Sequence, residues 1–373
     1  MRVGKLCRLA LRFWMGLILV LGFSSHYYSP TRRRLVHSRI LQTFNWLLMA
    51  INLMAFYAYY RYSRTYFLKA MFRRQRFVNQ VTAFNVFQQL MMMVTNIALH
   101  LLFEREVCQT YNEVSRILEQ ELKLTEHSRF FSLAFLAKVH NFMHNMNFGL
   151  SAVVHWGLRP FNFWDLLANL YFVYNSLARD ATQVVYVLLL LSLSEALRLN
   201  GQQEHSSYSG LMNLLRRQER LLSIGRRVHR RFAWLVTIAL FYLVFFNTAT
   251  IYLGYTMFIQ KHDPVGLRGR GLKMLLTADS FLVILWDVLL LQIVCEKLLA
   301  EQNHICASPQ NAASSRRTYR QWEMSVLRRA IRRASPENNV LGMFRMDMRC
   351  AFALISCSLS YGIIIIQIGY IPG

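Results

Sequence analysis

Residues 346–370 read Met-Asp-Met-Arg-Cys-Ala-Phe-Ala-Leu-Ile-Ser-Cys-Ser-Leu-Ser-Tyr-Gly-Ile-Ile-Ile-Ile-Gln-Ile-Gly-Tyr. After Arg349 this stretch has no charged side chain. It is long enough to cross the hydrocarbon core of a bilayer as a helix, which takes about 20 mostly apolar residues. A helix satisfies its own backbone hydrogen bonds in lipid, where water is absent. The stretch therefore predicts a transmembrane helix.

Further apolar stretches of similar length occur upstream, and 54% of the 373 residues are hydrophobic, more than a soluble core of this size needs. The sequence therefore predicts an all-α membrane protein with seven transmembrane helices, at residues 40–60, 78–103, 129–157, 162–196, 232–258, 274–297 and 346–370. The fourth stretch is longer than a span requires. We expect its end to continue as a helix beyond the bilayer.

The basic residues indicate how the chain crosses the membrane. The formal net charge is +24, and the Lys and Arg fall between the apolar runs rather than on one polar domain, which disfavours nucleic-acid binding. With the amino terminus in the cytoplasm, the inner segments hold 27 Lys and Arg and the outer segments 11. Because cytoplasmic loops are normally the more basic, this predicts a cytoplasmic amino terminus and an extracellular carboxyl terminus. The first loop opposes the trend, with six basic residues between 61 and 77.

The predicted spans divide the chain into four parts. Residues 1–39 form a cytoplasmic region, in which 13–23 are apolar and follow a basic start. A signal peptide is an alternative, but no small-residue cleavage site is evident, so we interpret 13–23 as a short membrane-dipping segment. Residues 40–300 hold the first six spans, with a ligand pocket expected in their outer half. Residues 346–373 form the last helix and a short extracellular tail.

The remaining part, residues 301–345, is predicted to be a cytoplasmic basic helical anchor region. Its arginines recur at helical spacing, which suits either a platform where subunits meet or a solvated basic face; they are Arg316, Arg317, Arg320, Arg328, Arg329, Arg332 and Arg333.

Cysteine and histidine spacing gives little support for a metal or a cofactor. The six cysteines are dispersed without a Cys-x-x-Cys pair, so we interpret them as reduced thiols. His140 and His144 stand four apart on the third span, with His155 beyond them, a spacing that can chelate a metal. No second motif accompanies them. We therefore predict that the protein is not an enzyme and has no cofactor.

The last span carries a motif that points to a family. It contains Ser360-Tyr361-Gly362 followed by four isoleucines and Gln367-Ile368. This resembles the signature of the insect gustatory receptors, Thr-Tyr, five hydrophobic residues, then Gln-Phe, in the final helix of that family. Upstream, residues 342–347, Gly-Met-Phe-Arg-Met-Asp, resemble the family's lead into the same helix. Ser360 stands for Thr and Ile368 for Phe, as in a divergent member.

The resemblance implies a tastant-gated, non-selective cation channel in the plasma membrane of chemosensory neurons. Its partners would be the lipid bilayer, a small-molecule tastant, and further receptor subunits in a homotetramer or a heteromer. The final helix of each subunit would line a central pore. A G-protein-coupled receptor needs the opposite topology, and the sequence lacks Asp-Arg-Tyr after the third span and Asn-Pro-x-x-Tyr in the last. A solute transporter is a further alternative, because intramembrane acids also serve proton coupling.

On the predicted final helix, Ile363 and Ile364 lie within roughly 60° of Gln367 around the axis. Four such stripes would form a ring of amides beside an apolar constriction, which suits weak cation conduction. The alternative for Gln367 is an interhelical hydrogen bond. Tyr361 lies about 120° away, so we expect it to pack on a neighbouring helix, with Gly362 and Gly369 allowing close approach.

Charged and polar side chains within the spans are the candidates for ligand recognition, since leaving a charge in lipid costs on the order of 3 kcal/mol. Polar helix–helix contacts are the alternative role for each of them. The candidates are Asp287 with its neighbour Trp286, then Asp279, Asp165, Tyr171, Tyr174, Asn247 and Tyr255. Arg179 and Asp180 are adjacent and point in different directions on a helix. We expect them to pair with other helices rather than with each other.

Overall fold

The computed structural model describes residues 3–32, 34–62, 77–124, 126–153, 163–203, 208–259, 267–307, 339–340 and 344–369. Within these ranges the predicted all-α membrane fold is confirmed, because each predicted span coincides with one long helix. Five of these helices contain a stretch that is long and apolar enough to cross a membrane. The seven helices are α2 (Arg39–Tyr62), α4 (Phe77–Ala98), α6 (Arg129–Ala152), α7 (Phe163–Gln202), α8 (Tyr208–Ile259), α9 (Leu267–Ala307) and α11 (Met348–Gly369).

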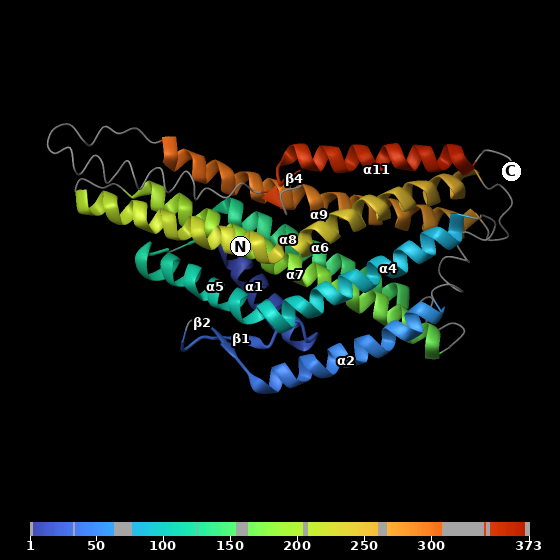
Figure 1. Cartoon of the computed structure of the whole chain (residues 1–373), viewed down its shortest axis with the longest axis horizontal. Helices are drawn as coiled ribbons and strands as arrows, with labels where there is room; N and C mark the ends of the chain where they lie inside the picture. Colours follow the sequence, from blue (N-terminus) through green and yellow to red (C-terminus); the bar gives the residue numbers. More distant parts are fainter. Residues whose placement is uncertain are drawn as a thin grey trace.

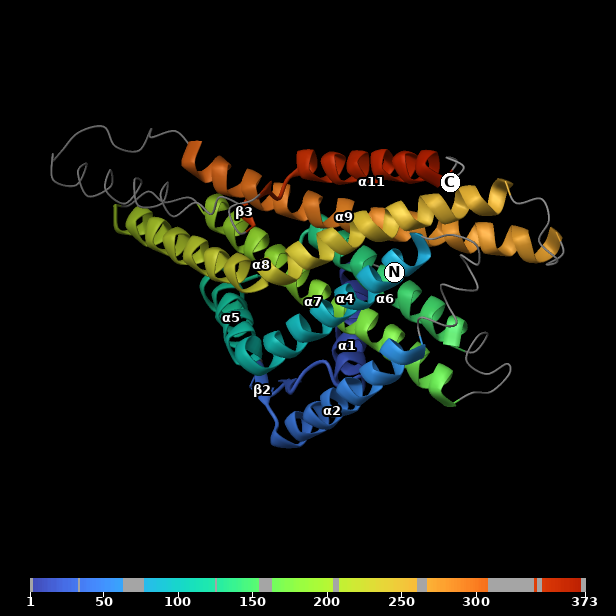
Figure 2. The same ribbon diagram turned by 45° about the vertical axis from the view of Figure 1, so that its right-hand side comes forward.

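Helix α7 forms the centre of the bundle, and it packs against α2, α4, α6, α8 and α9. In its most apolar stretch 78% of the residues are buried, against 17% in α2 and in α11. Helices α2 and α11 lie at opposite edges of the molecule in both views (Figures 1 and 2). The two outermost spans therefore each keep one face that none of the other described helices covers.

Three helices are much longer than a membrane is thick. Helix α8 has 52 residues, which at 1.5 Å per residue gives about 78 Å, while the hydrocarbon core is about 30 Å thick. Helix α7 continues to Gln202, past the end of the predicted span, as expected. The start of α8 and the end of α9 extend from the same end of the bundle (Figure 1). These extensions carry part of the protein beyond the bilayer on one side.

The amino-terminal segment folds into the bundle. Helix α1 (Val3–Val20) packs on α6, where the buried Trp14 meets Phe135 edge-on with ring centroids 6.5 Å apart. The chain turns at Gly22, whose φ is +70° and where a Cβ would lie 2.3 Å from Leu48 Cδ1, so only glycine fits. Strands β1 (His26–Ser29) and β2 (Arg34–His37) then pair antiparallel, with His26 opposite His37.

Beyond α4 the helix continues through a π-helical turn, η1 (Leu99–Phe103), into the polar helix α5 (Glu104–Arg116) and a second π turn, η2 (Ile117–Glu121). Acidic side chains of this segment pair with the arginines of α8. Glu113 accepts hydrogen bonds from Arg220 at 2.8 Å and Arg227 at 2.9 Å. Burial alone would raise the pKa of Glu113, but the two guanidinium groups outweigh it and lower this pKa below its usual value.

A short antiparallel pair, β3 (Asn339–Val340) and β4 (Phe344–Arg345), precedes α11. The arginines predicted to form the anchor region, between 316 and 333, lie outside the described residues, as do residues 63–76 of the adverse first loop.

Candidate functional site

Helix α11 is fixed in rotation by its contacts with α8 and α9. Its packed face carries Ala351, Ser358 and Gly362, all buried. A Cβ on Gly362 would lie 2.9 Å from Ile251 Cγ2 of α8, closer than ordinary contact allows. The close approach expected at Gly362 is therefore present.

The opposite face of α11 is exposed and carries a stripe of polar side chains. Ser356, Ser360 and Gln367 are exposed, and they lie within roughly 40° of one another around the helix axis. Ile363 and Ile364 flank Gln367 and are 54% and 45% exposed. An amide and two hydroxyls are poorly suited to lipid, which offers no hydrogen bonds. We call these three residues the α11 polar stripe (Ser356, Ser360, Gln367). Their side chains need hydrogen-bond partners from water or from another protein chain.

Tyr361 lies on a third side of α11. It is 55% exposed, so no described helix of this chain covers most of its surface, contrary to the packing expected from the sequence. The helices that flank α11, α8 and α9, both lie on the Gly362 side. Packing around Tyr361 must come from lipid or from another molecule.

The buried charges form a polar network between α6, α7 and α9. Lys138 of α6 is paired with Asp287 of α9 and donates a second hydrogen bond to Gln183 of α7 at 3.0 Å. Asn141, one turn along α6, also donates to Asp287, at 2.7 Å. The side chain of Lys138 is only 3% exposed, so this lysine depends on its partners for charge balance.

A second cluster of buried charges surrounds Arg179 and Asp180, and here the expectation that the two pair only with other helices is wrong. Arg179 Nε donates to Asp180 Oδ1 at 2.8 Å. The aliphatic stem of Arg179 is long enough to bend around the helix. Its guanidinium therefore reaches Asp180, although adjacent side chains leave a helix about 100° apart. Each residue also reaches another helix, since Asp180 accepts from Asn145 at 2.9 Å and Arg179 lies 4.7 Å from the Tyr242 ring centroid.

Comparison with known proteins identifies the family. A family model described as "7tm Chemosensory receptor" matches residues 11–371. A curated relative, putative gustatory receptor 10b of Drosophila melanogaster, is 82% identical over 373 residues, the full length of both chains. The chain belongs to the insect gustatory receptor family. It is therefore a chemosensory receptor embedded in the membrane, as its final-helix motif suggested.

Solved structures show that the fold of this gustatory receptor is shared more widely among insect chemoreceptors. The olfactory receptor OR5 of Machilis hrabei superimposes with a TM-score of 0.61 at 12% sequence identity, covering 96% of this chain and 98% of that one. The same olfactory receptor in complex with eugenol gives a TM-score of 0.58 at 13% identity, with the same coverage. At these identities the likeness concerns the fold.

The other predicted ligand residues of the receptor occupy several separate places. Asp279 pairs with His144 at 2.8 Å, a second link between α9 and α6 that involves one of the two histidines with metal-ligand spacing. Tyr171 is buried in a small aromatic cluster, 4.9 Å from the ring centroid of Tyr59, and Tyr174 meets Phe23 at 5.1 Å. The structure does not gather these side chains around one described cavity.

The remaining candidates divide between the interior and the surface of the receptor. Asn247 is buried in α8 at 1% exposure, whereas Trp286 is 50% exposed on α9. Tyr255 is partly buried, and the side chain of Asp165 and the whole of His155 lie outside the described parts.

Sequence reasoning overlooked the partners of Asp287. Lys138 stands alone among the apolar residues of the third span, so its charge signalled a buried acidic partner. It also overlooked a group formed by His26, Glu104 and Cys108 at the junction of α4 and α5. The reason is that 78 residues separate His26 from Glu104 in the sequence.

Proposed function

We propose that the receptor is a subunit of a tastant-gated, non-selective cation channel, in which α11 lines a pore shared by four subunits. The observation that carries this proposal is the α11 polar stripe. It lies on a face of α11 that no described helix of the chain covers, and polar side chains there need water or a second subunit. A pore on the axis of a symmetric assembly supplies both.

The proposed gate lies at Ile363, Ile364 and Gln367. Exposed branched side chains on four helices would narrow the pore with an apolar ring, which closes by excluding water. An amide offers its carbonyl dipole to a partly dehydrated cation without the strong attraction of a carboxylate. Weak discrimination among cations follows, as expected for a non-selective channel.

The proposed orientation places the amino terminus in the cytoplasm and the carboxyl terminus outside. The extensions of α7, α8 and α9 would then all be cytoplasmic, together with the seven arginines between residues 216 and 231. That distribution agrees with the basic character of cytoplasmic loops. We further propose that the receptor lies in the plasma membrane of chemosensory neurons, with its ligand-facing side outward.

The proposed ligand is a small organic tastant, bound among the spans in the outer half of the bundle. In support, a chemoreceptor of the same fold has been captured with eugenol, a small molecule. The candidates for orienting the ligand are those predicted from the sequence. Asp165, Asp279 and Asp287 are the charged ones, and the last two pair with side chains of α6. Their partners on α6 would link ligand binding to the packing of α6 against α9.

The test is current recording from cells that express the receptor, alone and with other gustatory receptor subunits, during application of a chemical panel. Replacing Gln367 with Glu adds a ring of carboxylates to the proposed pore. We expect it to raise the permeability of divalent relative to monovalent cations, because the ring attracts divalent cations more strongly.

The matched control is Gln367→Leu, which has a similar size and no polar group. We expect it to lower the single-channel conductance without the change in selectivity. Unaltered selectivity and conductance in both variants, at normal surface expression, would remove Gln367 from the pore.

A further inference from the structure

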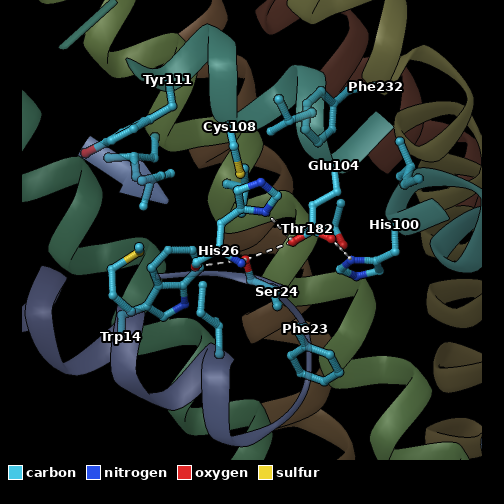
Figure 3. Close-up of a pocket in the computed structure, with 18 residues that line it drawn as sticks. Trp14, Phe23, Ser24, His26, His100, Glu104, Cys108, Tyr111, Thr182 and Phe232 are labelled. Atoms are coloured by element: carbon cyan, nitrogen blue, oxygen red, sulfur yellow. Dashed lines mark hydrogen bonds and ion pairs between the residues drawn. The ribbon is translucent and has the colours of Figure 1, made fainter. Parts of the chain in front are cut away.

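The junction of α4 and α5 contains a largely apolar cavity with a free volume of about 90 Å³. Its walls include Trp14 and Ile18 of α1, Leu99 of η1 and Phe232 of α8. Four side chains that can bind a metal line the same cavity and converge on it, as Figure 3 shows; they are His26, His100, Glu104 and Cys108. We call them the junction cluster. None of them belongs to the proposed pore or to the predicted ligand site.

The chain brings the junction cluster together by helical spacing and one long-range contact. His100, Glu104 and Cys108 follow one another at intervals of four residues, which places them on the same side of a continuous helix. His100 itself lies in the π turn η1, and short π segments within helices are frequent at functional sites. His26, the first residue of β1, approaches from the hairpin.

The donor atoms already lie near the geometry of a metal centre. One ligand atom each from His26, Glu104 and Cys108 lie within 4.8 Å of one another. His100 Nδ1 lies 3.9 Å from Glu104 Oε2, beyond hydrogen-bonding distance. Four ligands at about 2.0–2.3 Å from one Zn²⁺ would themselves be some 3–4 Å apart. The atoms of His26, Glu104 and Cys108 are already close to that spacing, and His100 would have to turn toward them to complete the set.

We propose that the junction cluster binds a divalent transition-metal ion of the Zn²⁺ type, with His26, His100, Glu104 and Cys108 as its four ligands. Imidazole, carboxylate and thiolate ligands are those that Zn²⁺ takes in tetrahedral protein sites. Charge balance supports this choice. One carboxylate and one thiolate neutralise the two positive charges of the ion, so the occupied site carries no net charge into its apolar surroundings. Binding releases the Cys108 proton to solvent.

The groups around Glu104 provide the outer shell that such a site needs. Its Oε1 accepts from the Ser25 backbone N–H at 2.6 Å and from Ser24 Oγ at 3.0 Å, and its Oε2 accepts from Ser25 Oγ at 2.9 Å. Hydrogen bonds of this kind fix the orientation of a ligating carboxylate. They are shared between the hairpin and α5, so a bound ion would fasten the amino-terminal segment to α5.

The competing interpretation is that the junction cluster is only a hydrogen-bond network. His26 Nδ1 lies 3.1 Å from Glu104 Oε1, and the serines satisfy the rest of the carboxylate. That network does not involve Cys108, whose sulfur has no role in it. The thiol therefore distinguishes the two interpretations.

The test uses the full-length receptor in lipid nanodiscs, treated with a chelator and titrated with Co²⁺ as a spectroscopic substitute for Zn²⁺. We expect a sulfur-to-cobalt charge-transfer band and the visible absorption of tetrahedral Co²⁺, both abolished by added Zn²⁺. Cys108→Ala should remove the charge-transfer band and weaken Zn²⁺ binding by more than about 100-fold, since even outer-shell changes cost 10–100-fold.

The matched control is Cys295→Ala, which removes another buried cysteine, on α9. It should leave the cobalt spectrum unchanged. His100→Gln is a second ligand variant, and it should lose tetrahedral absorption while keeping the thiol. Thermal unfolding without metal checks that each variant folds. Added Zn²⁺ should raise the unfolding midpoint of the natural receptor and of the Cys295→Ala control, but not that of Cys108→Ala or His100→Gln.

The proposal is overturned if the natural receptor shows no thiolate–cobalt band, or if Cys108→Ala binds Zn²⁺ as tightly as the natural chain does. This outcome would leave a hydrogen-bond network at the junction. It would not affect the proposed channel function, which rests on α11.

Discussion

At the scale of single residues, the interior of the receptor depends on the pairing of charges. Lys138 and Asp287 face each other between α6 and α9, and Lys138 is almost wholly buried. A buried ion pair gives little net stability compared with an apolar pair, but removing one partner leaves an uncompensated charge. Such a pair therefore specifies which helices must be adjacent and adds little to the total stability.

Asp287→Asn should lower the stability of the receptor by on the order of 3 kcal/mol, because Lys138 loses its counter-charge. Thermal unfolding in detergent measures this as a lower midpoint. The matched control is Asp279→Asn, whose side chain is 37% exposed and whose partner is a histidine, and its effect should be much smaller. The double variant Lys138→Met, Asp287→Leu should recover most of the loss. A larger effect at Asp279 than at Asp287 would contradict this account of the network.

At the scale of helices, spacing and apolar length predicted where each span lies but not how it is rotated. The runs at 40–60 and 274–297 appear as α2 and α9 because crossing a bilayer imposes a length that can be counted. The pairing of Lys138 with Asp287 depends on which faces of α6 and α9 meet, and 149 residues separate the two. Local periodicity carries no information on that contact. The contact between His26 and Glu104 could not be predicted for the same reason.

The motif in the last helix was informative beyond the family that it suggested. Gly362 was expected to allow close approach, and it touches Ile251. Tyr361 was expected to pack on a neighbouring helix and is 55% exposed, since none of the described helices of the chain covers that side. What the sequence could not indicate is which contacts of α11 are made within the chain and which are left for another subunit.

The contact of α11 with α8 can be tested at Gly362. Gly362→Ala should push α11 away from Ile251, since the added Cβ would lie at 2.9 Å, and it should lower the unfolding midpoint and the amplitude of the evoked current. Ile251→Ala in the same chain should restore both by making room. Gly225→Ala is the control, because a Cβ there would meet Leu193 at an ordinary 4.0 Å. Failure of Ile251→Ala to rescue would show that the close approach is not the cause.

The contact of α5 with α8 should depend on pH. The folded-state pKa of Glu113 is lowered from 4.5, so its contribution is complete above the unfolded pKa and is lost as pH falls through the folded one. Glu113→Gln should therefore lower the unfolding midpoint at pH 7. The loss in free energy of unfolding should be no more than about 1 kcal/mol, because the charged cluster is partly exposed to solvent. The difference in unfolding midpoint between Glu113→Gln and the natural receptor should shrink at the most acidic pH that the receptor tolerates. An effect that grows on acidification would contradict the assignment.

At the scale of the whole molecule, the receptor is built around α7 and is incomplete at α11. The central helix is buried by its own chain, whereas α11 lies along one edge of the molecule (Figure 2). The side chains of the α11 polar stripe are exposed. In the proposed assembly, with α11 on the shared axis, the stripe would be covered by other subunits and would line a water-filled path.

The most direct test is cysteine accessibility along α11 in a Cys357→Ser background, which removes the native thiol exposed on this helix. Ser360→Cys and Gln367→Cys should each react with a charged, membrane-impermeant thiol reagent during tastant application, and the current should fall as they react. Ser358→Cys, on the packed face, should be unaffected. Equal block at all three positions, or no block at Ser360→Cys and Gln367→Cys in channels that still open, would contradict a pore lined by α11.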